Sequence, residues 1–194
     1  MGKWSKVFLY AVPWPAQGLY SKNAINSKAD LKGLKFRAYN SSLIRLAELT
    51  GMVPTKIEAA EISQAFSTGA VESMITSPTT GKNSKIWENG VQYFYDIAAW
   101  YPKNMIIVNK DAWNKLDSAT QKLLMSEAAE AEKKGWALSK KGNKADKKAL
   151  ADAGMKVGKV NSALNKHFKE VGATMSKEWA SRAGSRGQAV LAAY

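Results

Sequence analysis

The residues best placed to bind a ligand lie in the second half of the segment DLKGLKFRAYNSS, residues 30–42. Residues 34–39 alternate apolar with basic side chains, which predicts a half-buried strand with Arg37 near its carboxyl end. Ser41 and Ser42 then stand as N-cap candidates for a helix over residues 42–49. A planar, permanently charged guanidinium beside free helix N–H groups is a good receptor for a carboxylate. The alternative interpretation of Arg37 is a surface cation in an edge strand.

Further polar residues are expected at the same end of the predicted sheet. Strands predicted over 53–57 and 71–76 flank a short helix over 61–67, and this alternation predicts a parallel sheet with right-handed crossovers. The turn-rich segment TSPTTG follows the last strand as a predicted loop. Ligands of open α/β sheets bind beyond the carboxyl ends of strands. Arg37 and Ser77 together therefore predict a small-anion site.

The second half of the chain predicts helices around one apolar strand. A helix is expected over 83–93, and the unalternated run NMIIVN predicts a strand over 104–109 that is buried on both faces. Ser118 and Gln121 have the spacing of a capping box before a long helix. A last helix is expected over 162–179, followed by a loose tail, GSRGQ. The buried side of the long helix is expected to include Leu123, Leu124, Ala128 and Ala131.

Residue usage excludes most enzyme chemistries. The 194-residue chain contains no cysteine and one histidine, His167. Thiol catalysis, structural zinc, disulfides and any Ser-His-Asp triad without His167 are therefore excluded. His167 lies in a predicted amphipathic helix and is interpreted as an ordinary helix residue. Carboxylates remain at Glu58, Glu61 and Glu72, but nothing pairs them with a nucleophile or a metal cluster. We expect a binding protein with no catalytic residues, no metal and no cofactor.

The net charge of +13 is concentrated in a lysine-rich stretch over residues 133–148. The simpler interpretation is a solvated helix face. The alternative function is binding of nucleic acid or an anionic membrane surface. Arginine is scarce there and Trp136 is the single aromatic residue, so a base-stacking platform is not evident. No apolar run approaches the roughly 20 residues that a membrane helix needs.

An ordered series of segments resembles the periplasmic solute-binding subunits of TRAP transporters, of the dicarboxylate and sialic-acid receptor type. The resemblance covers roughly residues 7–160, and no single motif in it is unique. The matching segments, in chain order, are DLKGLKFR, TGMVP, EISQAFSTGAVES, the Trp87–Glu88 step and NMIIVNKDAWNKLDSATQKLL.

The resemblance implies a periplasmic receptor that closes on a small organic acid and delivers it to the permease subunits of the transporter, with no role for nucleic acid. It implies that Arg37 forms a salt bridge with the ligand carboxylate. Some members carry a second arginine twenty residues earlier, where this chain has Gln17. Ser77 stands where the sialic-acid type has asparagine, so a strict sialic-acid receptor is not expected.

Other candidate ligand-binding residues lie close to these positions in the sequence. They are Trp14, Tyr39, Asn40, Thr76 and Trp100. For the aromatic residues, and for Tyr101, the alternative is core packing. Pockets for small ligands are largely apolar. Two aromatic side chains in the cleft would favour an aromatic or branched 2-oxo or 2-hydroxy acid over succinate.

The resemblance also implies a division into lobes. The expected fold class is α/β: the C-terminal portion of a periplasmic-binding-protein-like two-lobed fold, with a mostly parallel sheet flanked by helices and a long helix spanning the lobes. Residues 16–102 and 143–194 would form the ligand-binding lobe II. Residues 1–15 and 103–142 would be a remnant of lobe I, which is otherwise largely absent. No apolar signal-peptide segment precedes Pro13.

We therefore expect an N-terminally truncated fragment. Its strand over 104–109 should lack partners and expose apolar side chains. Binding of the acid by this chain alone should be weak, because a closing receptor binds with both lobes.

Overall fold

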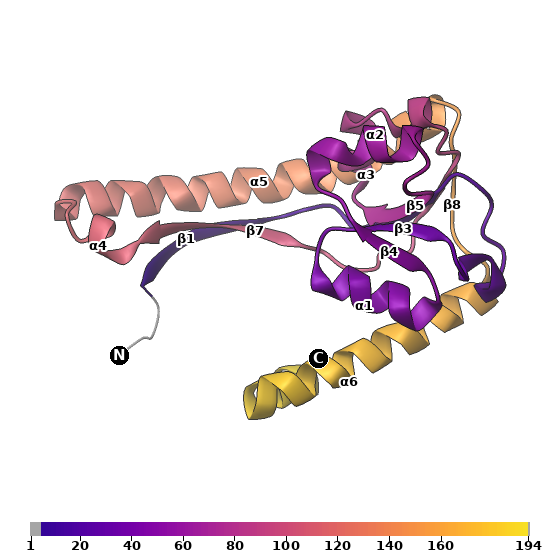
Figure 1. The fold of residues 1–194 in the computed structure, drawn as a ribbon. Helices are drawn as coiled ribbons and strands as arrows, with labels where there is room; N and C mark the ends of the chain where they lie inside the picture. The colour runs from indigo at the N-terminus through magenta and orange to yellow at the C-terminus, as the bar shows by residue number, and fades with distance from the viewer. Residues whose placement is uncertain (1–4, 194) are drawn as a thin grey trace.

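The computed structural model describes residues 5–193 and contains two sheets. We call the six-stranded sheet with its covering helices the body. We call the two-stranded sheet, with the N-terminal half of the longest helix lying along it, the arm (Figure 1). The arm extends to one side of the body, and the last helix extends to the same side below it.

The body sheet has the strand order β4-β3-β5-β2-β6-β8. Strand β2 runs antiparallel to both of its neighbours, whereas the other three pairings are parallel. The expectation of a mostly parallel sheet is thus confirmed, with β2 as an unpredicted exception. The strands are β2 Gly18–Ser21, β3 Lys35–Ala38, β4 Val53–Lys56, β5 Ser73–Thr76, β6 Tyr93–Tyr95 and β8 Lys156–Gly158.

Helix α1, Ser41–Thr50, follows β3 as the sequence predicts. Gly51 ends it with a φ of 78°, a left-handed conformation that glycine adopts without strain. The predicted cap at Ser41 or Ser42 is wrong, because the Asn40 side chain accepts the Leu43 N–H at 2.9 Å and is the N-cap. The other short body helices are α2 Ile62–Ser67, α3 Pro78–Asn83, and the 3₁₀ turns η1 Lys28–Leu31, η2 Ala59–Glu61 and η3 Ile86–Asn89.

Two predictions around α3 are wrong. The segment TSPTTG is not a loop, because Ser77 Oγ accepts the Thr80 N–H at 3.0 Å and Pro78 takes the first helical position. The predicted helix over 83–93 shrinks to the 3₁₀ turn η3. Lys85 and Gly90, at φ values of 43° and 80°, bound that turn on either side with left-handed backbone. The chain then enters β6.

The long helices differ from expectation at their ends. Helix α5, Ser118–Asp152, is capped by Asp117, whose side chain accepts the Thr120 N–H, so the predicted capping box is wrong. Gln121 instead donates to two carbonyl oxygens of the preceding turn. Helix α6, Ser162–Ala192, includes the predicted tail GSRGQ and bends at Gly184. Helix α4, Lys110–Trp113, precedes α5.

Two apolar clusters pack on the two faces of the body sheet. Neighbouring strand residues alternate between them: Leu19 and Ile75 lie in one, Tyr20 and Met74 in the other. The first cluster includes residues of α1 and α6, whereas the second includes residues of α2 and the C-terminal half of α5. The body therefore has a core on each face of its sheet.

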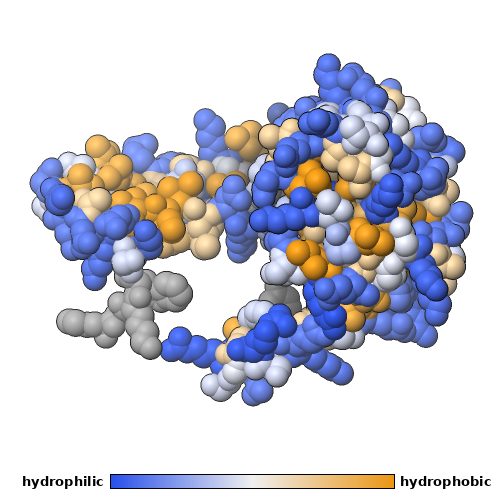
Figure 2. Space-filling model, viewed as in Figure 1, coloured by the Kyte–Doolittle hydropathy of each residue, from blue (hydrophilic) through white to orange (hydrophobic). Residues whose placement is uncertain are grey.

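The arm has a different character. Its strands β1, Lys6–Pro13, and β7, Lys103–Asn109, pair antiparallel, and α5 packs along β1. The predicted burial of β7 is wrong, because Met105 and Ile107 are 64% and 50% exposed. The expected exposure of apolar side chains is confirmed, while the expected lack of any partner strand is wrong. Figure 2 shows hydrophobic residues spread over the surface of the arm.

The predicted buried side of α5 is also wrong for its first turns. Ala128 is buried, but Leu123 and Leu124 are exposed because β1 covers only part of the helix. Among residues 5–193, no helix is long and apolar enough to cross a membrane.

Candidate functional site

Four of the predicted site residues meet at one edge of the body sheet. Arg37 lies near the carboxyl end of β3, and Thr76 ends β5 with Ser77 directly after it. Gln17 comes just before β2 and reaches the same edge, because β2 is antiparallel and its Gly18 pairs with Thr76. The sheet topology therefore brings these residues to one edge. For Arg37 and Ser77 this is the edge that the sequence predicts, at the carboxyl ends of parallel strands.

Arg37 is buried, and its strand lies inside the sheet, between β4 and β5. The interpretation as a surface cation in an edge strand is therefore wrong. Its Nε donates to the Ile57 carbonyl oxygen at 2.9 Å, and its guanidinium lies 4.8 Å from the centre of the Tyr39 ring. Burial lowers the pKa of Arg37 from its ordinary value, while Tyr39 and Glu58 act in the opposite direction.

No carboxylate among residues 5–193 lies within 4.0 Å of the Arg37 guanidinium. A cation held out of water without an anionic partner is unfavourable. The arrangement can therefore gain free energy by admitting an anion at the edge of the sheet.

Tyr39, Gln17 and Trp100 form a hydrogen-bonded group beside Arg37. The Tyr39 hydroxyl donates to Gln17 Oε1 at 2.9 Å, and Trp100 Nε1 lies 3.5 Å from the Tyr39 hydroxyl oxygen. The Gln17 backbone N–H donates to the Trp100 carbonyl oxygen at 3.1 Å. The group links the start of β2 to the segment after β6 and fixes the Tyr39 ring against Arg37.

Thr76 and Ser77 are buried, and the polar atoms of Ser77 are engaged within the body. Ser77 Oγ caps α3, and its carbonyl oxygen accepts the Tyr20 hydroxyl at 3.0 Å. Burial, together with the nearby Asp146 charge, raises the pKa of Tyr20, so its hydroxyl keeps the proton that it donates. Asn40 is similarly engaged as the cap of α1. Ser77 and Asn40 thus orient two helix starts at this edge.

Trp14 makes a separate set of contacts. It lies between β1 and β2, where the chain passes from the arm to the body, and its Nε1 donates to Asn104 Oδ1 at 2.9 Å. Its backbone N–H donates to the Pro102 carbonyl oxygen, so the two chain segments that join arm and body are bonded together. Tyr101, next to Pro102, is exposed.

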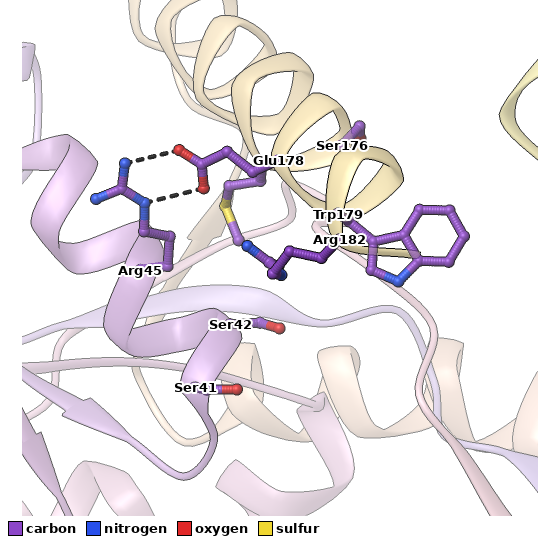
Figure 3. A pocket seen from close by; sticks show the side chains of 8 residues that line it. Ser41, Ser42, Arg45, Ser176, Glu178, Trp179 and Arg182 are labelled. Atoms are coloured by element: carbon purple, nitrogen blue, oxygen red, sulfur yellow. Dashed lines mark hydrogen bonds and ion pairs between the residues drawn. The ribbon is translucent and has the colours of Figure 1, made fainter. Parts of the chain in front are cut away.

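A cavity of about 670 Å³ opens between the start of α1 and the middle of α6 (Figure 3). Sequence reasoning missed the contribution of α6, because nothing local indicates that residues as far apart as Arg45 and Glu178, 133 positions, meet. Ser41 and Ser42 lie on the α1 side, and Trp179 and Arg182 on the α6 side. The lining residues are Ser41, Ser42, Arg45, Met175, Ser176, Glu178, Trp179 and Arg182.

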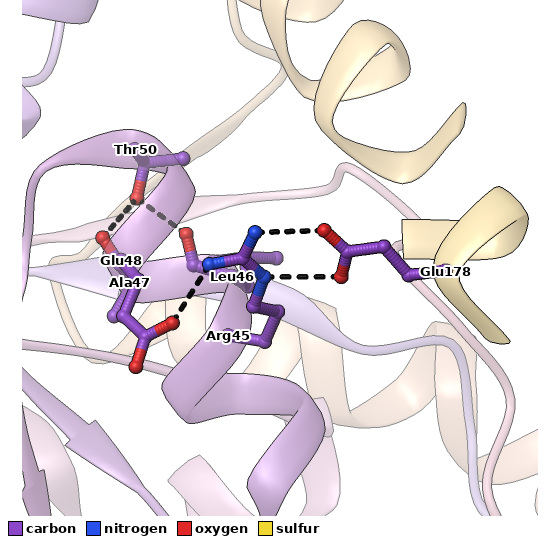
Figure 4. Close-up of polar contacts among 6 residues, drawn as sticks. All are labelled: Arg45, Leu46, Ala47, Glu48, Thr50 and Glu178. Atoms are coloured by element: carbon purple, nitrogen blue, oxygen red, sulfur yellow. Dashed lines mark hydrogen bonds and ion pairs between the residues drawn. The ribbon is translucent and has the colours of Figure 1, made fainter. Parts of the chain in front are cut away.

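Arg45 differs from Arg37 in having two carboxylate partners. It binds Glu178 of α6 through Nε and Nη2 at 3.0 and 2.7 Å, and Glu48 through Nη1 at 2.9 Å (Figure 4). These hydrogen bonds raise the pKa of Arg45 and lower that of Glu178. Arg45 therefore ties α6 to α1 and has its charge neutralised, whereas Arg37 has no carboxylate partner among residues 5–193.

Asp146 is a further buried charge that sequence reasoning missed. It lies on α5 and accepts hydrogen bonds from Thr79 Oγ1 at 2.6 Å and Lys82 Nζ at 2.8 Å, both on α3. The signal in the sequence is that Asp146 is an acidic residue within the lysine-rich stretch. Its side chain is buried and bonded to α3 rather than exposed to solvent. Within the described residues, no group of three His, Cys, Asp or Glu side chains could hold a metal ion.

The fold of the body and the arm is that of a known family of proteins. Residues 16–182 match the family described as bacterial extracellular solute-binding protein, family 7, and the chain belongs to that family. The family consists of substrate-binding receptors of TRAP transporters and not of enzymes.

Two curated relatives have similar sequences. A solute-binding protein of Chromohalobacter salexigens is 25% identical over 148 residues, which cover 75% of this chain and 44% of that protein. The sialic acid-binding periplasmic protein SiaP of Vibrio cholerae is 30% identical over 113 residues, covering 57% of this chain and 34% of that protein.

Solved structures show the same fold over nearly the whole chain. A TRAP solute-binding protein from a marine metagenome, specific for pyroglutamate, matches with a TM-score of 0.94 and 38% identity. DctP6 of Bordetella pertussis, an extracytoplasmic solute receptor binding pyroglutamic acid, matches with a TM-score of 0.94 and 40% identity. Each match covers 98% of this chain and 62% or 63% of the other, so the chain spans less than two thirds of these receptors.

The comparisons confirm the TRAP receptor fold and a family that binds organic acids. They give no support to nucleic-acid or membrane binding by the lysine-rich helix. Some of those lysines have structural partners, since Lys147 pairs with Asp96 and Lys148 with Asp152.

Proposed function

We propose that this chain is the ligand-binding lobe of an extracytoplasmic receptor for a small monocarboxylic acid, held by Arg37. The single observation that carries the proposal is the buried Arg37 guanidinium with no carboxylate partner among the described residues. A bidentate, charge-assisted pair with a ligand carboxylate would supply that partner.

Pyroglutamate is the acid that best fits both the site and the relatives. The position where some family members carry a second arginine is Gln17, which is neutral and bonded to Tyr39. One cation suits an acid with one carboxylate, whereas a dicarboxylate would leave its second charge unpaired. Receptors that are 38–40% identical to this chain bind pyroglutamate, a flat lactam with one carboxylate.

The remaining site residues would shape the rest of the cleft. The Tyr39 ring and Trp100 offer flat apolar surface next to Arg37, and Gln17 has an amide that can meet the lactam. The first turn of α1 at the same edge would offer the backbone N–H groups of Ser41 and Ser42, which the Asn40 cap does not use, to an anion. In the proposed role, the receptor binds the acid in the periplasm and delivers it to a permease in the membrane.

Ligand binding should be measured by ligand-observed NMR, with pyroglutamate, succinate and N-acetylneuraminate compared at equal concentration. This chain presents one side of a cleft, so we expect a Kd for pyroglutamate of about 1 mM or weaker, near −4 kcal/mol. Succinate and N-acetylneuraminate should bind at least about tenfold more weakly, equivalent to about 1.4 kcal/mol. A nanomolar Kd for any of the three would contradict the one-sided cleft.

Variants place the acid at Arg37. Arg37→Ala should abolish binding, because loss of one member of a buried charge pair costs about 2–5 kcal/mol. Arg186→Ala is the matched control, since it removes an exposed arginine of α6 and should leave binding unchanged. Equal binding by wild type and Arg37→Ala, or no binding of any acid at about 10 mM, would refute the proposal.

A further inference from the structure

Another cavity lies between α5 and the two segments that join the arm to the body. Its volume is about 340 Å³, within reach of the roughly 300–1,000 Å³ of small-molecule sites. Arg37, Gln17 and Tyr39 do not line it. The lining residues are Pro13, Trp14, Pro15, Ala16, Tyr101, Lys103, Trp136, Ser139, Lys140 and Asn143.

The walls of this crossing cavity are aromatic and come from three segments. Trp14 precedes β2, Tyr101 precedes β7, and Trp136 lies on α5. Two of the rings are held by hydrogen bonds: Trp14 Nε1 donates to Asn104, and Trp136 Nε1 donates to the Ala11 carbonyl oxygen at 3.1 Å. Flat apolar surfaces that are already fixed bind a ring with little loss of side-chain freedom.

The charge of the cavity is positive. Lys103 and Lys140 line it, and no acidic side chain does. Neither lysine has a carboxylate within 4.0 Å among residues 5–193, unlike Lys147 and Lys148 on the same helix. The Lys103 Nζ lies 5.4 Å from the centre of the Trp136 ring, so a cation stands directly over an aromatic wall.

One polar atom in the lining lacks a partner. Asn143 Oδ1 is buried and accepts no hydrogen bond from the described part of the chain. Leaving a buried acceptor unsatisfied costs about 1–3 kcal/mol. Because Oδ1 has no surface open to the cavity, a ligand N–H or O–H group would reach it only after the Asn143 side chain turns toward the cavity.

A neighbouring cavity of about 370 Å³ lies on the other side of Trp14 and does not share these features. It shares Pro13, Trp14, Pro15 and Ser139, but its charged lining residue is Asp146, which is already paired with Lys82. An anion is therefore favoured on the lysine side of Trp14.

We propose that the crossing cavity is a second ligand site, which takes an aromatic carboxylic acid bearing a hydrogen-bond donor. The carboxylate would lie between Lys103 and Lys140, and the ring between Trp14, Tyr101 and Trp136. The donor would meet Asn143 Oδ1 once that side chain has turned toward the cavity. Such a ligand touches both segments that join arm and body, together with α5. Its binding would therefore fix the arm relative to the body, independently of the acid at Arg37.

The probe is indole-3-acetate, which has a ring, a carboxylate and one N–H. Isothermal titration and ¹H–¹⁵N NMR should show binding, with the indole N–H signals of Trp14 and Trp136 among those that shift. Indole, which lacks the carboxylate, should bind at least about tenfold more weakly. No binding of indole-3-acetate at about 10 mM, or equal binding of indole, would overturn the proposal.

Three variants locate the probe. Lys140→Glu should weaken binding at least about tenfold, while Lys141→Glu, which makes the same charge change on a lysine outside the cavity, should leave it unchanged. Arg37→Ala should also leave it unchanged, which separates this site from the proposed pyroglutamate site. Equal losses in Lys140→Glu and Lys141→Glu, or loss in Arg37→Ala, would show that the probe binds elsewhere.

Discussion

The body and the arm use similar strand residues but differ in what covers them. Strand β2 of the body, GLYS, is buried along its whole length because helices cover both faces of its sheet. Strand β7 of the arm, KNMIIVN, is more apolar at its centre yet largely exposed, because its two-stranded sheet has a helix on one side. An apolar run therefore specifies a strand, whereas burial depends on a second layer elsewhere in the fold.

The largest expected difference between the two regions is in the free energy of unfolding that is lost when a phenylalanine of a strand is shortened to alanine. Phe36→Ala in β3 removes a fully buried ring and should lower the free energy of unfolding by about 3–5 kcal/mol. Phe8→Ala in β1 removes a half-exposed ring and should cost less than about 1 kcal/mol. Urea unfolding followed by far-UV circular dichroism measures both. Equal costs would show that the arm is buried in solution.

A buried polar contact between two helices of the body should be less costly to disturb than its apolar core. Asp146→Ala removes the carboxylate that accepts from Thr79 and Lys82, and should cost about 2 kcal/mol, the range for hydrogen bonds to a charged group. Lys82 is half exposed and can turn to water, which limits the loss. Asp152→Ala, which breaks an exposed pair with Lys148, should cost about 0.5 kcal/mol or less. The same unfolding assay compares them.

Within the arm, the packing of α5 on β1 depends on Gly135. A Cβ at this position would lie 2.5 Å from Val12 Cγ2, so Gly135→Ala should separate helix and strand, at about 1–3 kcal/mol for overpacking. Amide hydrogen exchange at Ala11, whose N–H donates to Glu132, should then accelerate. Gly142→Ala meets only the Asp146 carboxylate at 3.6 Å, and should stabilise α5 by up to about 1 kcal/mol. Changes of the same sign would contradict this account.

The sequence predicted well what local pattern determines. The alternation over 34–39, the helix after it and Gly51 at its end follow from side-chain periodicity and the conformational freedom of glycine, and β3 and α1 lie there. Arg37 was predicted as an anion receptor on the same grounds. The cap was misassigned, since Asn40, Ser41 and Ser42 are consecutive and are all residue types that cap helices well.

What the sequence left out depends on contacts between distant segments. Arg45 and Glu178 are 133 positions apart, and the sequence around each of them contains no pattern that indicates their contact. In strand β2, GLYS, apolar and polar side chains do not alternate, and all four residues are buried. Its antiparallel direction is set by its pairing with β5 and β6. The exposure of β7 similarly follows from the number of layers on it and not from its composition.

The smallest expected effect concerns the Arg45–Glu178 pair that ties α6 to the body. Arg45 lowers the pKa of Glu178, so the pair contributes stability above the ordinary glutamate pKa and loses it as the pH falls through the lowered value. The stability difference between wild type and Glu178→Gln should therefore be present at pH 7 and vanish once the pH has fallen below the lowered pKa of Glu178. An NMR titration of the Glu178 carboxyl carbon should give a higher pKa in Arg45→Met than in wild type. An unchanged pKa would show that α6 leaves α1 in solution, because a carboxylate released from the guanidinium titrates as an ordinary surface glutamate whether or not Arg45 is present.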